Sequence, residues 1–148
     1  MDLCNQKNGR DGFEQNILMK GSYVLLMKLN EDADIKIGAL GTIHFRKGCY
    51  AYVGSAMNGI EKRVERHMKK EKKKRWHIDY FLEKAKIVKV FYKESIEKEE
   101  CKLAGLFIKN AAYVKNFGAS DCKCHSHLFY SECSILERIA IEAGMKVL

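Results

Sequence analysis

The sequence predicts one α/β domain: a small, mainly antiparallel sheet of three to five strands flanked by helices. The length of 148 residues suits one compact core. Short apolar segments with strand character alternate with segments of helical periodicity. The chain contains no proline and no linker rich in glycine or serine. We therefore expect residues 21–148 to form the domain and residues 1–20 to be a polar extension.

Four segments are predicted as strands. Tyr23–Leu29 is apolar at nearly every position, which is typical of a strand buried on both faces, and Asn30–Asp34 then resembles a turn. The other strands are expected at Thr42–Arg46, Tyr50–Val53 and Ile87–Tyr92, with the first two joined as a hairpin around Lys47–Gly48.

Four helices are predicted between and after these strands. The first begins at Asn58, where Asn58 and Glu61 have capping-box spacing, and the second is Trp76–Ala85. The third runs from Ser95 or Ile96 to Ile108. The last has a capping box at Ser134–Glu137 and ends at Ala143, before Gly144.

The net charge of +8 is concentrated in one segment, because Glu61–Arg75 holds nine basic and three acidic residues. Such a block on an otherwise nearly neutral domain favours a polyanion partner, most commonly nucleic acid. A solvated lysine-rich helix face that binds nothing specific explains the charge equally well. The candidate nucleic-acid contacts are Lys62, Arg66, Lys69, Lys70, Lys72, Lys73, Lys74 and Arg75.

The N-terminal residues do not resemble a secretory signal, and no apolar run is long enough to cross a membrane. We therefore expect a cytoplasmic protein without a membrane contact. In a reducing compartment, the six cysteines are predicted to be free thiols or metal ligands rather than disulfides.

Helical projection separates three unusual polar residues from the surface charges. On the first helix, Arg63 lies at the edge of the apolar stripe and His67 lies inside it. A partly buried guanidinium needs an anionic partner, either a protein carboxylate or a phosphate. His67 alone is better explained as a hydrogen-bonded core histidine. On the third helix, Glu100 falls at the centre of the apolar face, which requires an ion pair, protonation or a metal.

Several motifs together resemble the GIY-YIG nuclease superfamily. They are Gly21-Ser22-Tyr23 on the first strand, Tyr52-Val53-Gly54-Ser55-Ala56 on a later strand, and Glu61-Lys62-Arg63 and Arg66-His67 on the next helix. The segment from Gly118 to Tyr130 is similar to an archaeal and bacterial branch of unassigned function, whose members occur alone or fused to glycosylases related to endonuclease III.

This resemblance implies roles for six residues. Tyr23 and Tyr52 match the two motif tyrosines, which act as general base or position the attacking water. Arg63 matches the arginine that stabilises the scissile phosphate, and Glu100 matches the carboxylate that holds one Mg²⁺ or Mn²⁺ ion. His67 and His77 match secondary candidates for proton transfer or phosphate contact.

The sequence departs from the family pattern in two ways. Ser22 replaces the isoleucine of the first motif, and residues 30–42 form an insertion between the two tyrosines. Residues 35–38 are a candidate strand within it. The insertion raises the question of whether the site can reach and cleave a substrate.

A second candidate metal site lies near the C-terminus, where Cys122, Cys124 and His127 offer zinc ligands. Their spacing is not that of a common zinc knuckle, and a fourth ligand such as Cys101 or Cys133 would have to come from elsewhere. A packed, hydrogen-bonded loop is the better explanation of this segment.

The sequence therefore predicts a metal-dependent DNA endonuclease that hydrolyses phosphodiester bonds in DNA repair or processing. The alternative is a non-catalytic nucleic-acid-binding module with the same fold. RNA is a further candidate substrate, because phosphate contacts do not distinguish the two polymers. The sequence does not indicate the oligomeric state.

Overall fold

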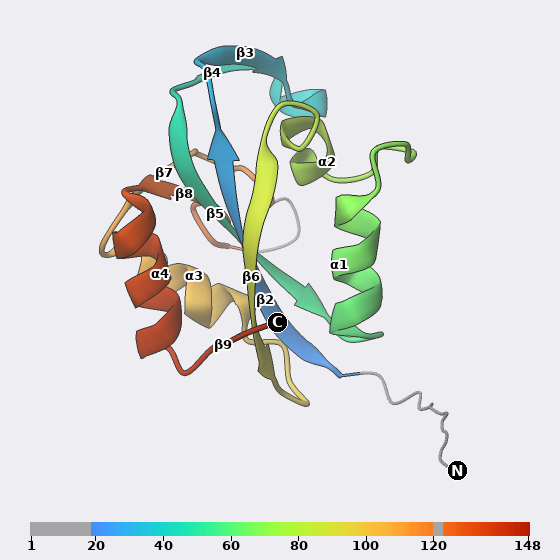
Figure 1. The fold of residues 1–148 in the computed structure, drawn as a ribbon, viewed down its shortest axis with the longest axis vertical. Coiled ribbons are helices and arrows are strands. Elements are labelled where there is room, and N and C mark those ends of the chain that lie inside the picture. The colour runs from blue at the N-terminus through green and yellow to red at the C-terminus, as the bar shows by residue number, and fades with distance from the viewer. Residues whose placement is uncertain (1–18, 120–122) are drawn as a thin grey trace.

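A six-stranded sheet runs through the centre of the computed structural model, which describes residues 19–119 and 123–148 (Figure 1). The strand order is β7-β8-β5-β2-β6-β9, and every described strand pair is antiparallel. The predicted fold class is confirmed, with more strands than expected. The strands are β2 (Gly21–Leu29), β5 (Gly48–Ala56), β6 (Lys86–Glu94), β7 (Ala112–Tyr113), β8 (Leu128–Ser131) and β9 (Lys146–Val147).

Strand β2 lies at the centre of the sheet, and its side chains form two separate cores. Tyr23 and Leu25 face one side, whereas Val24 and Leu26 face the other, and all four are almost fully buried. Alternate residues of a strand point to opposite faces, so burial of both faces explains the continuous apolar run in this segment.

Helices cover both faces of this sheet. On one face lie α1 (Ile60–Met68) and α2 (His77–Phe81), and on the other lie α3 (Glu100–Ile108) and α4 (Cys133–Glu142) (Figure 1). None of the described helices is long and apolar enough to cross a membrane.

The helix boundaries correct several predictions. Helix α1 follows Gly59 without a side-chain cap, so the capping box predicted at Asn58 does not form. Helix α2 is shorter than expected, and α3 begins at Glu100, which leaves Ile96 89% exposed in the preceding loop. Helices α1 and α3 therefore start without a side-chain cap, whereas at the start of α2 the Asp79 carboxylate accepts the backbone N–H of Trp76.

Helix α4 shows the same effect at its start and confirms the prediction at its end. Its N-cap is Glu132 rather than Ser134, and the Glu137 carboxylate accepts a hydrogen bond from the Lys89 ammonium group at 2.7 Å. Gly144 follows the helix with a φ of 86°, a conformation that glycine adopts without steric cost.

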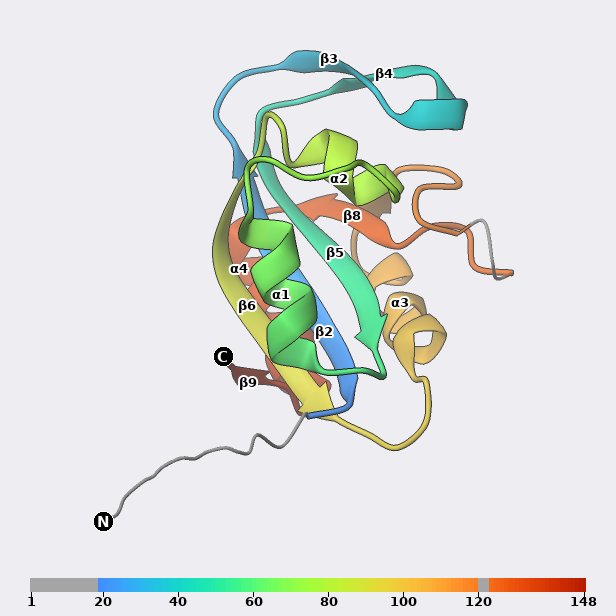
Figure 2. The same cartoon turned by 90° about the vertical axis from the view of Figure 1, so that its right-hand side faces the viewer.

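The insertion between the two motif tyrosines folds on itself. It contains β3 (Ala33–Lys36), the 3₁₀ helix η1 (Gly38–Leu40) and β4 (Thr42–Phe45), and β4 pairs with β3. The hairpin predicted between β4 and β5 is therefore wrong. The insertion packs on α2, where the Phe45 and Phe81 rings lie 4.9 Å apart (Figure 2).

A disulfide joins Cys49 on β5 to Cys133 at the start of α4. The expectation that all the cysteines are free thiols or metal ligands is thus wrong for this pair. Cys49 lies on the sheet face that α4 covers, so packing brings together two residues separated by 84 positions. Sequence spacing alone does not reveal such a pair.

Helix α2 is anchored to α1 through the buried carboxylate of Asp79. The Arg66 guanidinium donates to both of its oxygens at 2.9 and 3.0 Å, and the backbone N–H groups of Arg75 and Trp76 donate to Oδ2. Burial alone would raise the pKa of Asp79, but these hydrogen bonds outweigh it, and the pKa is lowered. The carboxylate is therefore ionised at neutral pH.

We expect Asp79→Asn to lower the free energy of unfolding by about 2–4 kcal/mol, because it leaves Arg66 beside an uncharged partner in a buried site. Asp34→Asn is the matched control, since Asp34 pairs with His44 on the surface, and we expect it to change stability by less than about 1 kcal/mol. Urea denaturation at pH 7 measures both. Equal effects of the two substitutions would contradict this role of Asp79.

Candidate functional site

The register of β2 with β5 brings the two motif tyrosines together. Tyr23 lies opposite Gly54, and Tyr52 lies two residues before Gly54 on the same face. The Tyr23 ring covers Gly54 so closely that an added Cβ would overlap it. The two tyrosine rings are 6.4 Å apart between centroids. The glycine of the motif thus provides the space that the tyrosine pair needs.

His67 forms a hydrogen bond with Tyr23 across the interior of this site. The Tyr23 hydroxyl and His67 Nε2 are 2.7 Å apart, and both residues are buried. Burial lowers the pKa of His67 from 6.5 to about 3, so the ring is neutral at physiological pH. Within the described part of the chain, the other ring nitrogen, Nδ1, has no hydrogen-bond partner. The predicted core histidine is therefore also a partner of the first tyrosine.

Arg63 lies beside the tyrosines, at the edge of β5. Its guanidinium donates to the Ser55 carbonyl at 3.1 Å and lies over the Trp76 ring, 4.6 Å from the centroid. Arg66 stacks on the same ring at 4.2 Å. Among residues 19–119 and 123–148, no carboxylate forms an ion pair with Arg63. The charge of this partly buried arginine is thus available to an anionic ligand.

Trp76 is a site residue that the sequence analysis missed. It was assigned only to the start of a helix, yet its ring orients Arg63 and lies 6.1 Å from the His67 ring. Trp76 is the only tryptophan in the sequence, and this is the one signal that could have pointed to it as a site residue.

Glu100 reaches this site from the opposite face of the sheet. Strand β8 pairs with only the first half of β5, Cys49–Tyr52, and α3 lies beside the remaining edge of β5 (Figure 2). Glu100 is the first residue of α3 and is partly buried. Its place on the apolar face is confirmed, because the buried residues Leu103, Ala104 and Phe107 follow it at helical spacing. The helix starts later than predicted, so Glu100 lies not mid-helix but in the first turn, where a carboxylate is favoured by the helix dipole.

The charges of Arg63 and Glu100 act on both tyrosines. Burial is the main reason that the pKa values of Tyr23 and Tyr52 lie above the usual value of 10.0. The positive charge of Arg63 opposes this rise in both residues, and the negative charge of Glu100 adds to it. Arg63 and Glu100 are therefore close enough to both hydroxyls to act on their ionisation.

His77, a secondary candidate for proton transfer or phosphate contact, lies against the loop around Gly118. Its Nδ1 accepts a hydrogen bond from the Gly118 backbone N–H at 2.8 Å, and its ring packs on Phe117. Gly118 in turn lies against the Tyr52 ring, with a φ of 69°. His77 thus holds the loop that supports Tyr52, and burial lowers its pKa.

The basic segment is only partly available to a ligand. Arg66 binds Asp79, Lys74 pairs with Glu83 at 2.9 Å, and the Lys72 ammonium group donates to three backbone carbonyls at the end of α1. The exposed basic residues without such contacts are Lys62, Lys69, Lys70, Lys73 and Arg75. A cleft of about 600 Å³, lined by several lysines, leads from this surface to His67.

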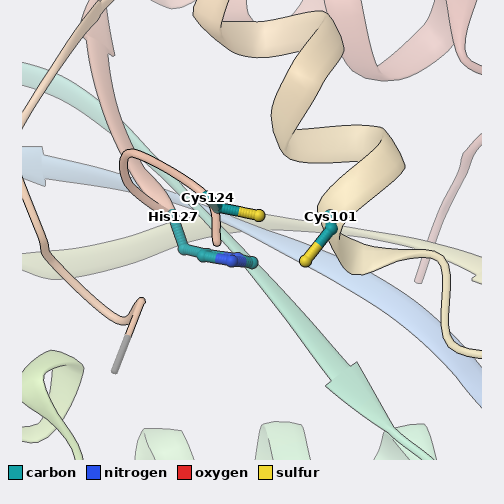
Figure 3. A group of neighbouring side chains, drawn as sticks. All are labelled: Cys101, Cys124 and His127. Atoms are coloured by element: carbon teal, nitrogen blue, oxygen red, sulfur yellow. The ribbon is translucent and has the colours of Figure 1, made fainter. Parts of the chain in front are cut away.

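A second cluster lies near the start of α3. The Sγ atoms of Cys101 and Cys124 and a ring nitrogen of His127 lie within 4.8 Å of one another and could hold a metal ion (Figure 3). The predicted ligand Cys122 lies outside the described residues. Of the two distant partners considered, Cys101 joins the cluster, whereas Cys133 forms the disulfide.

A family model described as "Domain of unknown function DUF123" matches residues 22–146. The chain belongs to this family. No curated protein and no solved structure matches this chain. The match spans both motif strands, α1, α3 and the Cys–His cluster, so the whole candidate site lies within the DUF123 domain.

The lowered pKa of His67 predicts that the stability of the DUF123 domain depends on pH. Folding lowers the pKa of this histidine, so between pH 6.5 and about 3 the unfolded chain binds a proton that the native state does not. The stabilisation is complete above pH 6.5 and decreases as the pH falls. We expect the free energy of unfolding to decrease by about 2 kcal/mol between pH 7 and pH 5.

In His67→Gln this pH dependence should largely disappear, whereas His44→Gln, which alters an exposed histidine, should retain it. Urea denaturation at several pH values measures the difference. An unchanged pH dependence in His67→Gln would rule out a neutral buried imidazole at this position.

Proposed function

We propose that this domain is a metal-dependent DNA endonuclease of the GIY-YIG type, which hydrolyses phosphodiester bonds in DNA repair or processing. The observation that carries the proposal is the position of Arg63. Its guanidinium has no carboxylate partner among the described residues, and it lies beside two tyrosines and a neutral histidine. A structural arginine would be neutralised by a carboxylate, as Arg66 is by Asp79.

Arg63 binds the scissile phosphate in this proposal. The Ser55 carbonyl and the Trp76 ring fix the guanidinium before the substrate arrives, so little reorganisation is needed as negative charge develops in the transition state. An arginine is suited to this role because it stays protonated and can donate two parallel hydrogen bonds to phosphate oxygens.

Tyr23 and His67 form a hydrogen-bonded pair that positions the attacking water in this proposal. A tyrosine with a raised pKa is protonated at neutral pH and is a weak base, and a histidine with a lowered pKa is also a poor proton acceptor. The neutral Nε2 of His67 instead accepts the Tyr23 hydrogen bond at 2.7 Å, which fixes the hydroxyl so that its oxygen can accept a hydrogen bond from water. Because Nδ1 has no described partner, no second hydrogen bond holds the ring in one tautomer. Tyr52, which is only partly buried, positions the water.

Glu100 is the residue that would hold Mg²⁺ or Mn²⁺. The fit rests on its carboxylate, which is partly buried and forms no ion pair with another described residue. A single carboxylate suits a hard cation that keeps most of its water ligands and is held weakly without substrate. Such an ion supplies charge stabilisation to the leaving oxygen.

The exposed lysines and the lysine-lined cleft support nucleic acid as the substrate. The cleft connects the basic segment to His67, so a backbone bound along the lysines would pass close to the Tyr23–His67 pair. Backbone contacts carry no base information, and RNA therefore remains an alternative substrate. The non-catalytic module is the second candidate function, favoured by the burial that keeps both tyrosines protonated.

We expect the purified protein to nick supercoiled plasmid or branched duplex DNA when Mg²⁺ or Mn²⁺ is present and not when EDTA is added. Arg63→Ala and Glu100→Gln should each reduce the single-turnover rate by about a hundredfold or more, because each removes charge stabilisation of the transition state. Gel electrophoresis of DNA and RNA substrates in parallel measures the rate and identifies the polymer.

Matched controls distinguish a lost reaction from a lost fold. Glu65→Gln and Glu97→Gln alter exposed neighbours of the two residues, and we expect near-normal cleavage from both variants. Circular dichroism verifies that all four variants are folded. DNA binding without cleavage in any metal would leave the non-catalytic module as the function.

The salt dependence of DNA binding tests the basic surface separately. Five exposed basic residues are available, so the plot of log K against log salt should have a slope of about −4.5, at about −0.9 for each phosphate contact. The double variant Lys69→Gln/Lys70→Gln should make this slope shallower by nearly 2. The control Arg138→Gln/Lys146→Gln, which removes exposed charges elsewhere, should leave it unchanged, and a flat response of the wild type would exclude a nucleic-acid partner.

A further inference from the structure

We propose that Cys101, Cys124 and His127 bind a structural zinc ion that fastens the start of α3 to the loop before β8. This inference stands on the geometry of the three residues and does not require nuclease activity. Only its consequence for Glu100 rests on the proposed function.

The three side chains come from two segments that are distant in sequence, the start of α3 and the loop before β8. Cys101 lies in the first turn of α3, Cys124 lies in the loop between β7 and β8, and His127 directly precedes β8. Figure 3 shows the two sulfur atoms and the imidazole ring directed toward one another. Their ligand atoms lie within 4.8 Å. In a tetrahedral site with zinc–sulfur distances near 2.3 Å, two sulfurs are separated by about 3.8 Å, so a shift of about 1 Å completes the site.

A hydrogen bond to His127 prepares its ring for a metal. Nδ1 lies 3.1 Å from the Val53 carbonyl oxygen. A carbonyl oxygen can only accept, so Nδ1 carries the proton and Nε2 keeps its lone pair. A metal-binding histidine commonly donates its second ring N–H to a carbonyl in this way, which fixes the tautomer and the ring orientation. His127 is also 2% exposed, so its ring position is determined by packing.

The donor atoms select the metal. Two cysteine sulfurs and one imidazole nitrogen form a soft to borderline set that suits Zn²⁺ and is unsuited to Mg²⁺ or Mn²⁺, which prefer oxygen. The described residues provide three of the four ligands of a tetrahedral site. This centre is thus chemically distinct from the hard cation proposed at Glu100, and the two ions would not compete.

The centre lies next to the proposed catalytic residues in two ways. Cys101 directly follows Glu100, and Val53, which orients His127, lies between Tyr52 and Gly54 on β5. Helix α3 starts without a side-chain cap, so a metal bond from Cys101 would fix its first turn. Zinc would therefore fix the position of Glu100 at the start of α3, which lies against β5.

We expect the intact protein, purified under reducing conditions without added zinc, to contain close to one zinc per chain by elemental mass spectrometry. Cobalt exchanged into the protein should give a thiolate-to-cobalt charge-transfer band and the visible bands of a tetrahedral ion. Cys101→Ser, Cys124→Ser and His127→Gln should each weaken zinc binding by about a hundredfold or more. His125→Gln is the matched control in the same loop and should bind zinc normally.

Hydrogen exchange tests the structural role without reference to activity. Zinc should slow exchange at the start of α3 and in residues 124–128 of the wild type, and should have no effect in Cys101→Ser. If the reduced protein holds no zinc and cobalt gives no charge-transfer band, the proposal is wrong. A nuclease that is inactive but retains zinc would instead contradict only the function proposed for Glu100.

Discussion

The antiparallel register between β2 and β5 is the constraint on which the remaining structure of the site depends. It sets Tyr23 against Gly54, with Tyr52 as the diagonal neighbour on the same face. A shift by one residue would turn one strand over relative to the other and place the two tyrosines on opposite faces of the sheet. The register is strongly specified because β2 is buried on both faces, and each face requires its own apolar residues. The same burial that fixes the register also raises the pKa of both tyrosines.

Helix α1 combines structural and chemical functions on adjacent turns. Arg66 ties the helix to Asp79 on α2, whereas Arg63, three residues earlier, contacts the Ser55 carbonyl, the Trp76 ring and the Tyr23 hydroxyl and has no carboxylate partner among the described residues. The Trp76 ring contacts both guanidinium groups. The Arg66–Asp79 ion pair therefore helps to position Arg63 through this shared ring. His67, four residues after Arg63, is kept neutral by burial. An arrangement of this kind maintains a cation and a neutral base close together without a carboxylate that would neutralise the cation.

The chemical residues of the site were largely predictable from the sequence, whereas the residues that position them were not. Arg63 and His67 could be placed because helical periodicity relates side chains three and four positions apart. Trp76 and Gly118 act across loops and carry no periodic signal. Cys101 likewise joins Cys124 only because α3 passes beside β5. The capping box predicted at Ser134–Glu137 does not form, and the Glu137 carboxylate instead accepts a hydrogen bond from Lys89 on β6.

By itself, the sequence determined the two-sided burial of β2, the clustering of positive charge near α1, and the motifs on which the proposed function rests. Each of these depends on interactions between neighbouring residues. Only the tertiary structure decided the strand order, the folding of the insertion on itself, the Cys49–Cys133 pair and the approach of Glu100 to the tyrosines around an open sheet edge. These depend on which apolar faces pack together, and that is a property of the whole domain rather than of any local segment.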